Sequence, residues 1–483
     1  MSVKLLYEIS VKGKKAYSLP PLDVPSIPIS QLLPDELQRK KIGLPQVSEP
    51  EIVRHFTNLA TQNYGVDTGF YPLGSCTMKY NPKINEDLAA MEEFLNIHPL
   101  QDEETVQGAL EIIYNSAELL KEITGMDKFT LFPAAGAHGE LTGMMITKKY
   151  FESIGEGEKR KKILIPDSAH GTNPASAATV KYEVCTIKSG INGEVDLEDL
   201  RKNTDESVAA LMLTNPNTLG IFEHNIIEIA KIMHSKGSIL YYDGANLNAL
   251  LGYARPGDMG FDIVHLNLHK TFSTPHGGGG PGSAPVGVKE YLAPYLPVPI
   301  VEKKNSKFYF SYNYPLTIGR IRLSGPNFNV ILKTYAYILT LGAKGLREVS
   351  SQAVINANYI RENLKDYYSQ DMRSRCMHEC VLNPSEYLKY GVKAKDISKR
   401  LIDYGMHPPT NYFPLIVPEA LMIEPTETES KETLDEFIEV MIKIAEEAKE
   451  NPTLLLEAPH NTPVRRPDEV KAARDLDVAY LVK

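Results

Sequence analysis

Val208-Ala-Ala-Leu-Met-Leu-Thr214, followed by Asn215-Pro216-Asn217, is the stretch that decides the fold. The apolar run is short and continuous and stops at turn-forming residues, so it predicts a buried strand that ends in a turn. From Ile221 to Lys236 the apolar side chains recur at helical spacing, and Gly237 follows as a C-terminal cap. Ser238-Ile-Leu-Tyr-Tyr242 then predicts a second strand. A strand, a helix and a strand in this order favour a parallel sheet covered by helices.

Polar side chains directly follow this second strand and the next one. Asp243 comes after Tyr242, and Asp262-Ile-Val-His-Leu-Asn-Leu268 predicts a third strand that leads into His269 and Lys270. Open α/β sheets bind their ligands at the carboxyl ends of the strands. We therefore expect Asp243 and Lys270 to face one site.

Lys270 and Asp243 suit a pyridoxal phosphate (PLP) site. A lysine between a buried strand and the glycine run Gly277-Gly-Gly-Gly280 can be partly desolvated, which favours the neutral amine that forms a Schiff base. A carboxylate at Asp243 would keep the pyridine nitrogen protonated, and the cofactor needs that proton to act as an electron sink. The alternatives are an ordinary surface lysine near a turn and an aspartate that caps the next helix.

Two further segments place small or aromatic polar residues at strand ends. Gly136, Ala137 and His138 stand at the start of a helical run, where backbone N–H groups can cradle a phosphate. His170 follows the apolar run Ile163-Leu-Ile165, and an imidazole there could stack on a flat cofactor. The alternative for His170 is a hydrogen-bonded structural histidine.

Composition describes an ordinary globular protein of more than one domain. The 483 residues carry 42% apolar and 23% charged side chains and a net charge of −9, which disfavours nucleic acid and anionic membranes as partners. We expect no membrane helix and no secretory signal, and four scattered cysteines suit the cytoplasm. Cys376-Met-His-Glu-Cys380 lacks a second ligand pair, so two small apolar residues on a strand are favoured over a metal site, and no metal is expected.

The pattern along the chain divides it into four parts. Residues 1–69 hold several prolines and predict an N-terminal extension. Residues 70–326 alternate strands and helices and predict the large α/β domain that would hold PLP. Residues 327–451 predict a smaller α+β C-terminal domain, with a strand near Glu379 to Leu382 and a helix from about Glu432 to Lys449. Residues 452–483 predict a C-terminal tail.

Long sequence blocks at these positions point to a family. The blocks are Tyr71-Pro-Leu-Gly-Ser-Cys-Thr-Met-Lys79, Asp167-Ser-Ala-His-Gly-Thr-Asn-Pro-Ala-Ser176, Asp243-Gly-Ala-Asn-Leu-Asn248, Asn267-Leu-His-Lys-Thr-Phe272 and Pro275-His-Gly-Gly-Gly-Gly-Pro281. Together they closely resemble the glycine dehydrogenase (decarboxylating) P-protein family. The resemblance implies the fold-type-I, aminotransferase-like architecture, with Lys270 as the Schiff-base lysine, Asp243 on the pyridine nitrogen and His170 on the ring. It also implies cofactor contacts from Gly136, Ala137, His138, Asn215 and His269.

The resemblance also implies an activity and partners. Members decarboxylate glycine with PLP and pass the aminomethyl group to the lipoyl arm of H-protein, the reaction of EC 1.4.4.2. Single-chain members are two homologous halves, of which the second holds the lysine, and this chain resembles that half alone. It is therefore expected to be subunit 2 of a heterotetramer that it forms with subunit 1 in the glycine cleavage system.

Some assignments stay open at this point. Arg320 and Arg322 are candidates for binding the glycine carboxylate, against ordinary ion pairs or subunit contacts. Cys76 is a candidate substrate-proximal thiol, although buried cysteines are usually inert. Two rival functions remain: another PLP enzyme of the same fold, such as an aminotransferase or a cysteine desulfurase, and a scaffold subunit that performs no chemistry.

Overall fold

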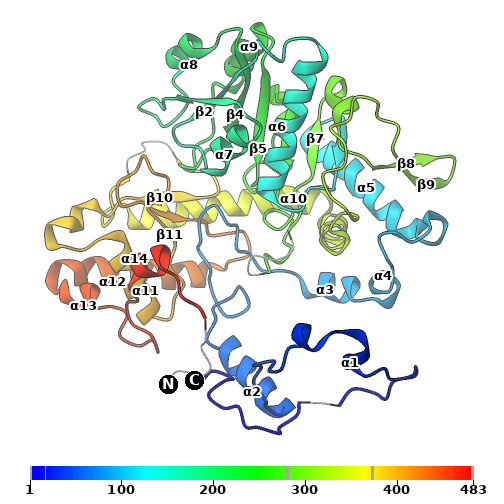
Figure 1. The fold of residues 1–483 in the computed structure, drawn as a ribbon. Helices are drawn as coiled ribbons and strands as arrows, with labels where there is room; N and C mark the ends of the chain where they lie inside the picture. The colour runs from blue at the N-terminus through cyan, green and yellow to red at the C-terminus, as the bar shows by residue number, and fades with distance from the viewer. Residues whose placement is uncertain (1–2, 17, 278–281, 371–374, 480–483) are drawn as a thin grey trace. The chain divides into compact units, whose positions relative to one another are not determined.

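Seven strands form the sheet that carries the candidate site (Figure 1), in the order β1-β7-β6-β5-β4-β2-β3. The five strands from β3 to β6 run parallel, while β7 is antiparallel to both of its neighbours. The parallel strand, helix and strand predicted from the sequence are therefore confirmed. The bounds are β1 Lys128–Thr130, β2 Lys162–Pro166, β3 Glu183–Ile187, β4 Val208–Thr214, β5 Ile239–Gly244, β6 Ile263–Leu266 and β7 Val286–Val288.

This computed structural model describes residues 3–16, 18–277, 282–370 and 375–479. Three of the four glycines in the predicted loop, Gly278 to Gly280, lie outside them. The chain divides into two compact units, one of residues Gly69–Glu457 and one that joins Met1–Thr68 to Ala458–Lys483. In the second unit, α2 begins with a capping box between Ser48 and Glu51.

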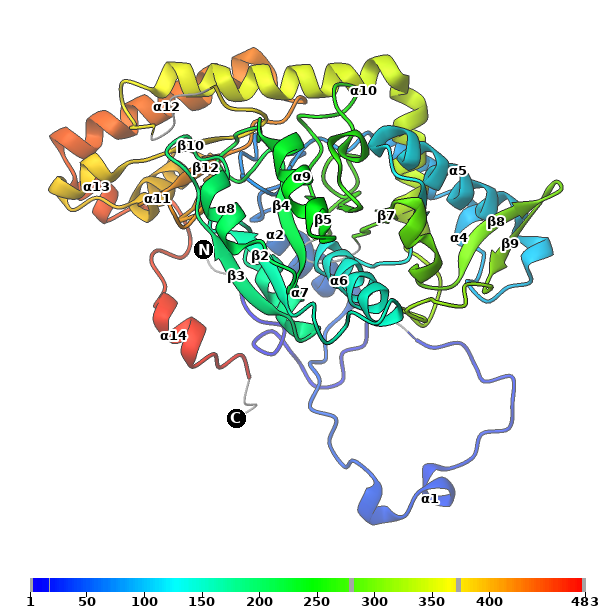
Figure 2. The same cartoon turned by 90° about the horizontal axis from the view of Figure 1, so that it is seen from above.

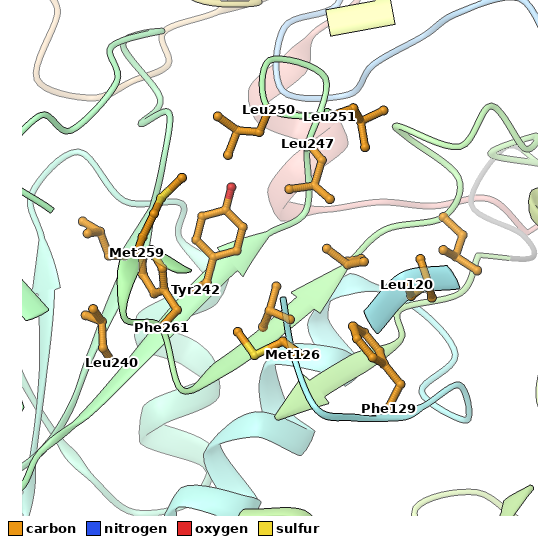
Figure 3. Close-up of a cluster of buried hydrophobic side chains, with 14 of the residues drawn as sticks. Leu120, Met126, Phe129, Leu240, Tyr242, Leu247, Leu250, Leu251, Met259 and Phe261 are labelled. Atoms are coloured by element: carbon orange, nitrogen blue, oxygen red, sulfur yellow. The ribbon is translucent and has the colours of Figure 1, made fainter. Parts of the chain in front are cut away.

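Neighbouring side chains of the sheet face two separate cores, because successive residues of a strand point to opposite faces. On β5, Tyr242 packs into a cluster with residues of α5, α9 and α10, while Tyr241 packs with residues of α6 and α7. The Tyr242 ring lies 4.7 Å from the Phe261 ring, among leucines from the loop after β5 (Figure 3). Both faces of the sheet are therefore covered, and its carboxyl edge is left to carry chemistry.

The helix after β4 begins later than the sequence indicates. The periodic pattern starts at Ile221, but α9 runs Ile226–Ser235. Gly220 has a φ of +74°, and the Asn217 side chain accepts hydrogen bonds from the backbone N–H groups of Leu219 and Ile221. These contacts hold residues 217–221 in a turn, so the helix begins only after it. Gly237, with a φ of +69°, follows the helix as predicted.

The long helical segment α10, which is kinked at Gly342, leads from the large sheet to the C-terminal part of the same unit. Figure 2 shows α10 passing from beside α5 to beside α12, and it contacts both. There a three-stranded sheet in the order β10-β12-β11 packs with α11 and α12 around its own core. The predicted strand and helix of this region are present as β10 Cys380–Leu382 and α12 Lys431–Glu450.

Fourteen α-helices, five 3-10 helices and twelve strands make up the described structure. Besides α9 and α12, the α-helices are α1 Ile29–Leu32, α2 Glu49–Ala60, α3 Lys83–Ala89, α4 Glu92–Leu95, α5 Gln107–Thr124, α6 Gly136–Ser153, α7 Thr172–Thr179, α8 Leu197–Asn203, α10 Phe328–Leu364, α11 Ala394–Asp403, α13 Thr453–Leu456 and α14 Glu469–Arg474. The 3-10 helices are η1 Asp35–Leu37, η2 Glu103–Thr105, η3 Pro256–Met259, η4 Glu290–Tyr295 and η5 Ser385–Tyr390. The other strands are β8 Ile300–Lys304, β9 Lys307–Ser311, β11 Thr410–Asn411 and β12 Leu421–Ile423. Within the described part of the chain, no helix combines the length and the apolar character that a membrane span requires.

Candidate active site

A polar cavity of about 150 Å³ opens at the carboxyl ends of β4, β5 and β6. Residues from seven regions of the described chain line it: Ser75, Gly136, Ala137, Glu140, His170, Thr172, Thr214, Pro216, Thr218, Asp243, Ala245, Asn246, Asn267, Lys270, His378 and Glu379. A larger cavity of about 220 Å³ between α4, α5 and α10 is lined almost wholly by apolar side chains. The chemistry-bearing groups therefore gather in the first cavity.

Lys270 supplies the amine of this cavity. It follows β6, and no other lysine lines the cavity among the residues described. Its ammonium forms no hydrogen bond or ion pair with a described side chain, unlike the buried Lys79. The charge of Lys270 nevertheless lowers the pKa of neighbouring groups on several elements, including Cys76, His276 and Glu379. An amine without a partner at a polar cavity is available to react with a carbonyl.

Asp243 is the anion opposite this amine. It is 4% exposed, and its carboxylate accepts hydrogen bonds from Asn173 Nδ2 at 2.9 Å and from the Ala245 N–H at 3.1 Å. Burial favours a higher pKa, but His265, these two hydrogen bonds and Lys270 together lower the pKa of Asp243 below its ordinary value. Asp243 therefore stays ionised, as the partner of a protonated pyridine nitrogen must.

A second carboxyl group beside Asp243 behaves in the opposite way. Burial, and next the charge of Asp243, raise the pKa of Glu140 to about 7. Its oxygens accept hydrogen bonds from Thr172 Oγ1 at 2.8 Å and Asn173 Nδ2 at 3.0 Å. Asn173 therefore bridges the two carboxyl groups, and near neutral pH Glu140 holds a proton for much of the time.

The register of the sheet supports Asp243 from the neighbouring strand. Asp243 on β5 pairs with His265 on β6, and His265 Nε2 lies 3.4 Å from Asp243 Oδ1. On its other side, His265 Nδ1 lies 2.7 Å from the Tyr241 hydroxyl. Burial raises the pKa of Tyr241 well above its ordinary value and lowers the pKa of His265, so the hydroxyl keeps its proton and the imidazole is neutral. Because Nε2 faces the ionised Asp243, the tautomer with the proton on Nε2 is favoured, and Nδ1 then accepts a hydrogen bond from the Tyr241 hydroxyl.

The start of α6, which the sequence predicts to bind a phosphate, lies at the wall of the cavity. Gly136 and Ala137 line the cavity, and no side chain caps the 18-residue helix α6 in the described structure. Its first backbone N–H groups are therefore available to a phosphate. A Cβ atom at Gly136 would lie 2.8 Å from the Asn267 amide nitrogen, so only glycine leaves this space open.

His170 also lines the cavity, as the sequence predicts. Its Nδ1 lies 2.9 Å from Thr172 Oγ1, and the ring meets Phe413 edge-on at 5.6 Å. Partial burial lowers the pKa of His170, and Lys270 adds to this against the effect of Asp243. A neutral ring at the cavity suits stacking on a cofactor, which stays a prediction.

Three other predicted cofactor contacts do not line the cavity. His138 Nδ1 accepts a hydrogen bond from the Ala134 N–H, and the Asn215 side chain accepts one from the Glu223 N–H. His269 meets His276 edge-on at 5.1 Å. Burial, with smaller contributions from His276 and Lys270, lowers the pKa of His269 to about 3, so it is a poor proton carrier at neutral pH.

The candidates for the carboxylate and the thiol are not among the residues that line this cavity. Arg320 and Arg322 line a separate cavity with Phe132 and Tyr312, and Arg320 packs on the Tyr312 ring. Burial raises the pKa of the Cys76 thiol although Lys270 opposes the change, which disfavours a reactive thiolate. Cys376 and Cys380 are both buried and unpaired in the structure.

Several residues of the site were not predicted from the sequence to lie there. Asn173 lies in the sequence block Asp167 to Ser176, but the direction in which its side chain points depends on where α7 starts. Glu140 comes one helical turn after Gly136, a spacing that reveals it only once Gly136 is known to face a cavity. His378 and Glu379 come from the C-terminal part and reach the cavity only through tertiary packing.

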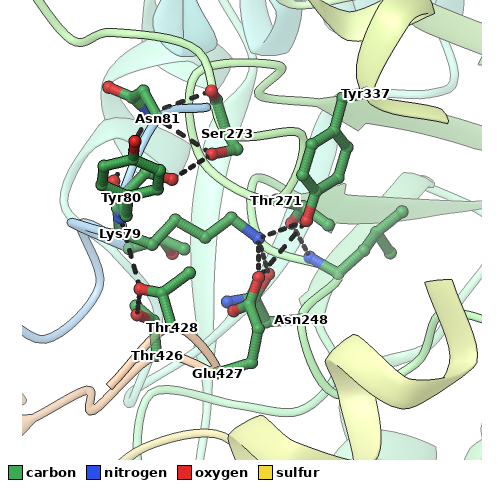
Figure 4. A network of polar contacts seen from close by, with 12 residues as sticks. Lys79, Tyr80, Asn81, Asn248, Thr271, Ser273, Tyr337, Thr426, Glu427 and Thr428 are labelled. Atoms are coloured by element: carbon green, nitrogen blue, oxygen red, sulfur yellow. Dashed lines mark hydrogen bonds and ion pairs between the residues drawn. The ribbon is translucent and has the colours of Figure 1, made fainter. Parts of the chain in front are cut away.

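The polar contacts of Lys79 hold residues 71–79 in place beside the cavity (Figure 4). Its ammonium lies 2.7 Å from Glu427 Oε1, 3.3 Å from the Tyr337 hydroxyl and 3.4 Å from Asn248 Oδ1. These partners come from the loop after β12, from α10 and from the loop after β5. The network thus joins the two parts of the unit and holds Ser75 at the cavity.

Comparison with known proteins identifies the family. A profile described as "Glycine cleavage system P-protein" matches residues 22–307, and one described as "Glycine dehydrogenase, C-terminal domain" matches residues 349–465. A curated relative from Caldanaerobacter subterraneus subsp. tengcongensis is 62% identical and covers 98% of this chain and 97% of its own length. The chain belongs to the glycine cleavage system P-protein family. That relative, and one from Fervidobacterium nodosum at 59% identity over 97% of this chain and 98% of the relative, are both named "Probable glycine dehydrogenase (decarboxylating) subunit 2".

Solved structures place this P-protein family member in fold type I. A crystal structure of glycine decarboxylase (P-protein) in inhibitor-bound form matches at a TM-score of 0.73 and 21% identity, covering 86% of this chain and 94% of that one. A cysteine desulfurase from Thermococcus onnurineus matches at 0.61 and 16%, covering 79% and 95%. The fold class predicted from the sequence is confirmed, and family membership makes PLP the cofactor.

The residues present fit that cofactor. The cavity offers an amine, an ionised carboxylate and an uncapped helix start. Thr214 Oγ1 and Asn267 Oδ1 are buried in its wall without a partner among the described residues. Buried polar atoms of this kind are normally satisfied, so they indicate that a polar ligand completes the site.

Proposed function

We propose that this chain decarboxylates glycine with PLP held at Lys270 and passes the aminomethyl group to the lipoyl arm of H-protein (EC 1.4.4.2). The observation that carries the proposal is the placement of Lys270, the ionised Asp243 and the start of α6 around one cavity. Family membership selects glycine among the substrates that such a site could take.

The residues of the chain have distinct tasks in this proposal. Lys270 would anchor the cofactor and, once glycine has displaced it, stay close as a base. Asp243 would hold a proton on the pyridine nitrogen, while Asn173 and His265 keep its carboxylate in place. The N–H groups of Gly136 and Ala137 would bind the phosphate. When bound, PLP supplies a sink for the electrons left behind as carbon dioxide departs.

The proposal includes partners and a compartment. Relatives are named subunit 2, which supports pairing with a subunit 1, and we propose a heterotetramer of the two. Glycine and lipoylated H-protein are the proposed substrates. The unpaired cysteines suit a reducing compartment, which supports the cytoplasm. We keep the division into residues 1–69, 70–326, 327–451 and 452–483 as a proposal, in which the third part supplies His378 and Glu379 to the site.

Borohydride reduction tests the cofactor site first. The purified protein is supplied with PLP, reduced, digested and searched by mass spectrometry for a pyridoxyl-modified lysine. Lys270 should carry the group, while Lys79 serves as an internal control because it is buried in an ion pair. Lys270→Ala should lose the modification, and Lys344→Ala, which changes an exposed lysine of α10, should keep it. If no lysine is modified, the scaffold function becomes the better proposal.

Release of labelled carbon dioxide tests the reaction. The chain is combined with its subunit 1 and lipoylated H-protein and given carboxyl-labelled glycine. Release that depends on Lys270 and on H-protein supports the proposal. Amino-group transfer from glycine without carbon dioxide release would instead favour an aminotransferase.

A further inference from the structure

Two buried carboxyl groups lie side by side at the C-terminal edge of the cavity. Glu379 and Glu424 stand one residue beyond the paired residues Cys380 and Ile423 of β10 and β12. Glu379 is 3% exposed and Glu424 is 0% exposed, and their nearest oxygens lie within 4.8 Å. Glu379 lines the cavity that Lys270 also lines. The functional roles proposed above use neither group.

The two groups differ in their hydrogen bonds. Glu424 accepts three, from Thr77 Oγ1 at 2.7 Å, from the Thr77 N–H at 3.1 Å and from Asn246 Nδ2 at 2.7 Å. From the described residues Glu379 accepts one, from the Ser75 N–H at 3.0 Å. Ser75 and Thr77 both have positive φ, at 62° and 52°, so this turn is held in a strained form that aims its N–H groups at the carboxyls.

This difference decides which group holds a proton. Burial, and then the charge of Glu424, raise the pKa of Glu379 well above its ordinary value. Burial also raises the pKa of Glu424, but three donors and Lys270 oppose the change. Two buried carboxyls this close cannot both ionise, so the pair keeps one proton. It resides on Glu379, because the three donors stabilise the charge on Glu424.

None of the described titratable groups next to Glu379 on this wall of the cavity is a better proton donor than Glu379. His378 lies 4.0 Å away, and burial lowers its pKa to about 3, so its ring is neutral. Burial raises the pKa of Cys76, Cys376 and Cys380, so these thiols keep their protons and are weak acids. The His378 Nδ1 atom is buried and has no hydrogen-bond partner within the described structure, so a bound ligand could form a hydrogen bond with it.

We propose that Glu379 is the catalytic acid that protonates the sulfur released when the aminomethyl group enters the lipoyl disulfide. The inference rests on the proposed function. In this step the substrate carbon forms a bond to one sulfur, the S–S bond breaks, and its electron pair stays on the second sulfur. That sulfur takes the proton of Glu379, which becomes a carboxylate and recovers a proton from solvent after the product leaves.

The assignment follows from the needs of the step. The sulfur released from the disulfide carries a negative charge and needs a proton, and a protonated carboxyl at the wall of the cavity is positioned to donate one. The His378 and His170 rings are neutral and are therefore poor donors. Lys270 is committed to the cofactor and substrate in the proposed function. Glu424 keeps its charge, and so raises the proton affinity of Glu379 between cycles.

Infrared spectroscopy of the protein without cofactor tests the shared proton directly. At neutral pH the carbonyl band of a protonated carboxyl should lose intensity in Glu379→Gln. Glu386→Gln, which changes an exposed glutamate of η5, should leave the band unchanged. A band of equal intensity in wild type and Glu379→Gln would overturn the proposal. This readout needs neither PLP nor activity.

Kinetics of the loaded assembly test the role of the acid. Glu379→Gln should still form a reducible adduct at Lys270 and keep its KM for glycine within about threefold, because ground-state binding does not use the proton. Transfer to H-protein should fall roughly 10²–10⁴-fold, the usual loss for a general acid. Glu379→Asp should recover part of the rate. A Glu379→Gln rate within about threefold of wild type would overturn the proposal.

The pH profile separates a catalytic acid from a structural residue. The wild-type transfer rate should fall at alkaline pH as Glu379 ionises. In Glu424→Gln that alkaline limb should move to lower pH, because the neighbouring negative charge is gone. If the alkaline limb of Glu424→Gln lies at the same pH as that of the wild type, the proposal that the two carboxyls share a proton is wrong. If the wild-type assembly releases no carbon dioxide, the proposed function fails, and the infrared result still reports separately on the pair.

Discussion

The ion pair of Lys79 and Glu427 should stabilise the folded protein measurably, and Lys79→Met tests this at nearly constant volume. Lys79 is 2% exposed and loses three partners in the variant, while Glu427 keeps only the Tyr337 hydroxyl, at 3.3 Å, among the described residues. Removing one member of a buried pair costs about 3–5 kcal/mol. For a unit of this size that is a fall in Tm of roughly 4–6 °C.

The assay is thermal unfolding of the protein without cofactor at neutral pH. Glu427 raises the pKa of Lys79 in the folded state against the effect of burial, so the contribution is fully present below the ordinary pKa of 10.5. It is lost only as the pH rises through the higher folded value. Lys307→Met is the matched control, because Lys307 pairs with Glu104 at an exposed site, and its Tm should not change.

A double variant separates charge from packing. Lys79→Met with Glu427→Leu removes both charges, so it should be more stable than Lys79→Met alone. The reasoning is refuted if the Tm of Lys79→Met equals that of the wild type and of Lys307→Met. It is also refuted if the double variant loses the sum of the two single effects, because independent sites add.

Three further predictions concern the cavity and the sheet. Gly136→Ala should weaken PLP binding roughly tenfold, because overpacking of this kind costs about 1–3 kcal/mol; Gly171→Ala, with open space around it, should leave a PLP titration unchanged. Asp243→Asn should still load PLP but release labelled carbon dioxide roughly a hundredfold more slowly, about 2.7 kcal/mol of barrier, and a rate near wild type would contradict its role. His234 donates to Asp262 at 2.9 Å, and this hydrogen bond raises the pKa of His234. Its stabilisation is therefore present below pH 6.5 and lost as pH rises through the folded pKa, so the Tm difference from His234→Gln should shrink between pH 6 and pH 9.

The sequence predicts those parts of the site that local patterns determine. β4, β5 and β6 are continuous apolar runs, so their ends, and with them Asp243 and Lys270, can be located without a structure. Side-chain direction is another matter. His269 and Lys270 are adjacent in the chain, yet only Lys270 lines the cavity, and the backbone turn after β6 decides which of them does. Asn215 turns to the Glu223 backbone for a similar reason.

The residues that could not be predicted are those that meet through long-range packing. Glu379 and Glu424 become neighbours only through the antiparallel register of β10 and β12, and they reach Lys270 only because this sheet packs beside the large one. No spacing in the sequence encodes that contact. A short strand such as Cys380–Leu382 can be predicted, whereas the partner across from it cannot.

The charge of the whole cavity explains why the protons lie where they do. Among the described residues, three carboxyls and one amine line the cavity where glycine would enter, and a fourth carboxyl, that of Glu424, lies beside Glu379. With every group ionised, the carboxyls would repel an anionic substrate. Protons on Glu140 and Glu379 leave two carboxylates, of which Asp243 is committed to the cofactor and Glu424 is covered by three donors. The proton on Glu379 therefore removes one negative charge from the wall that the substrate carboxylate would meet. Ionising Glu379 would both remove the acid and add a charge that repels the substrate.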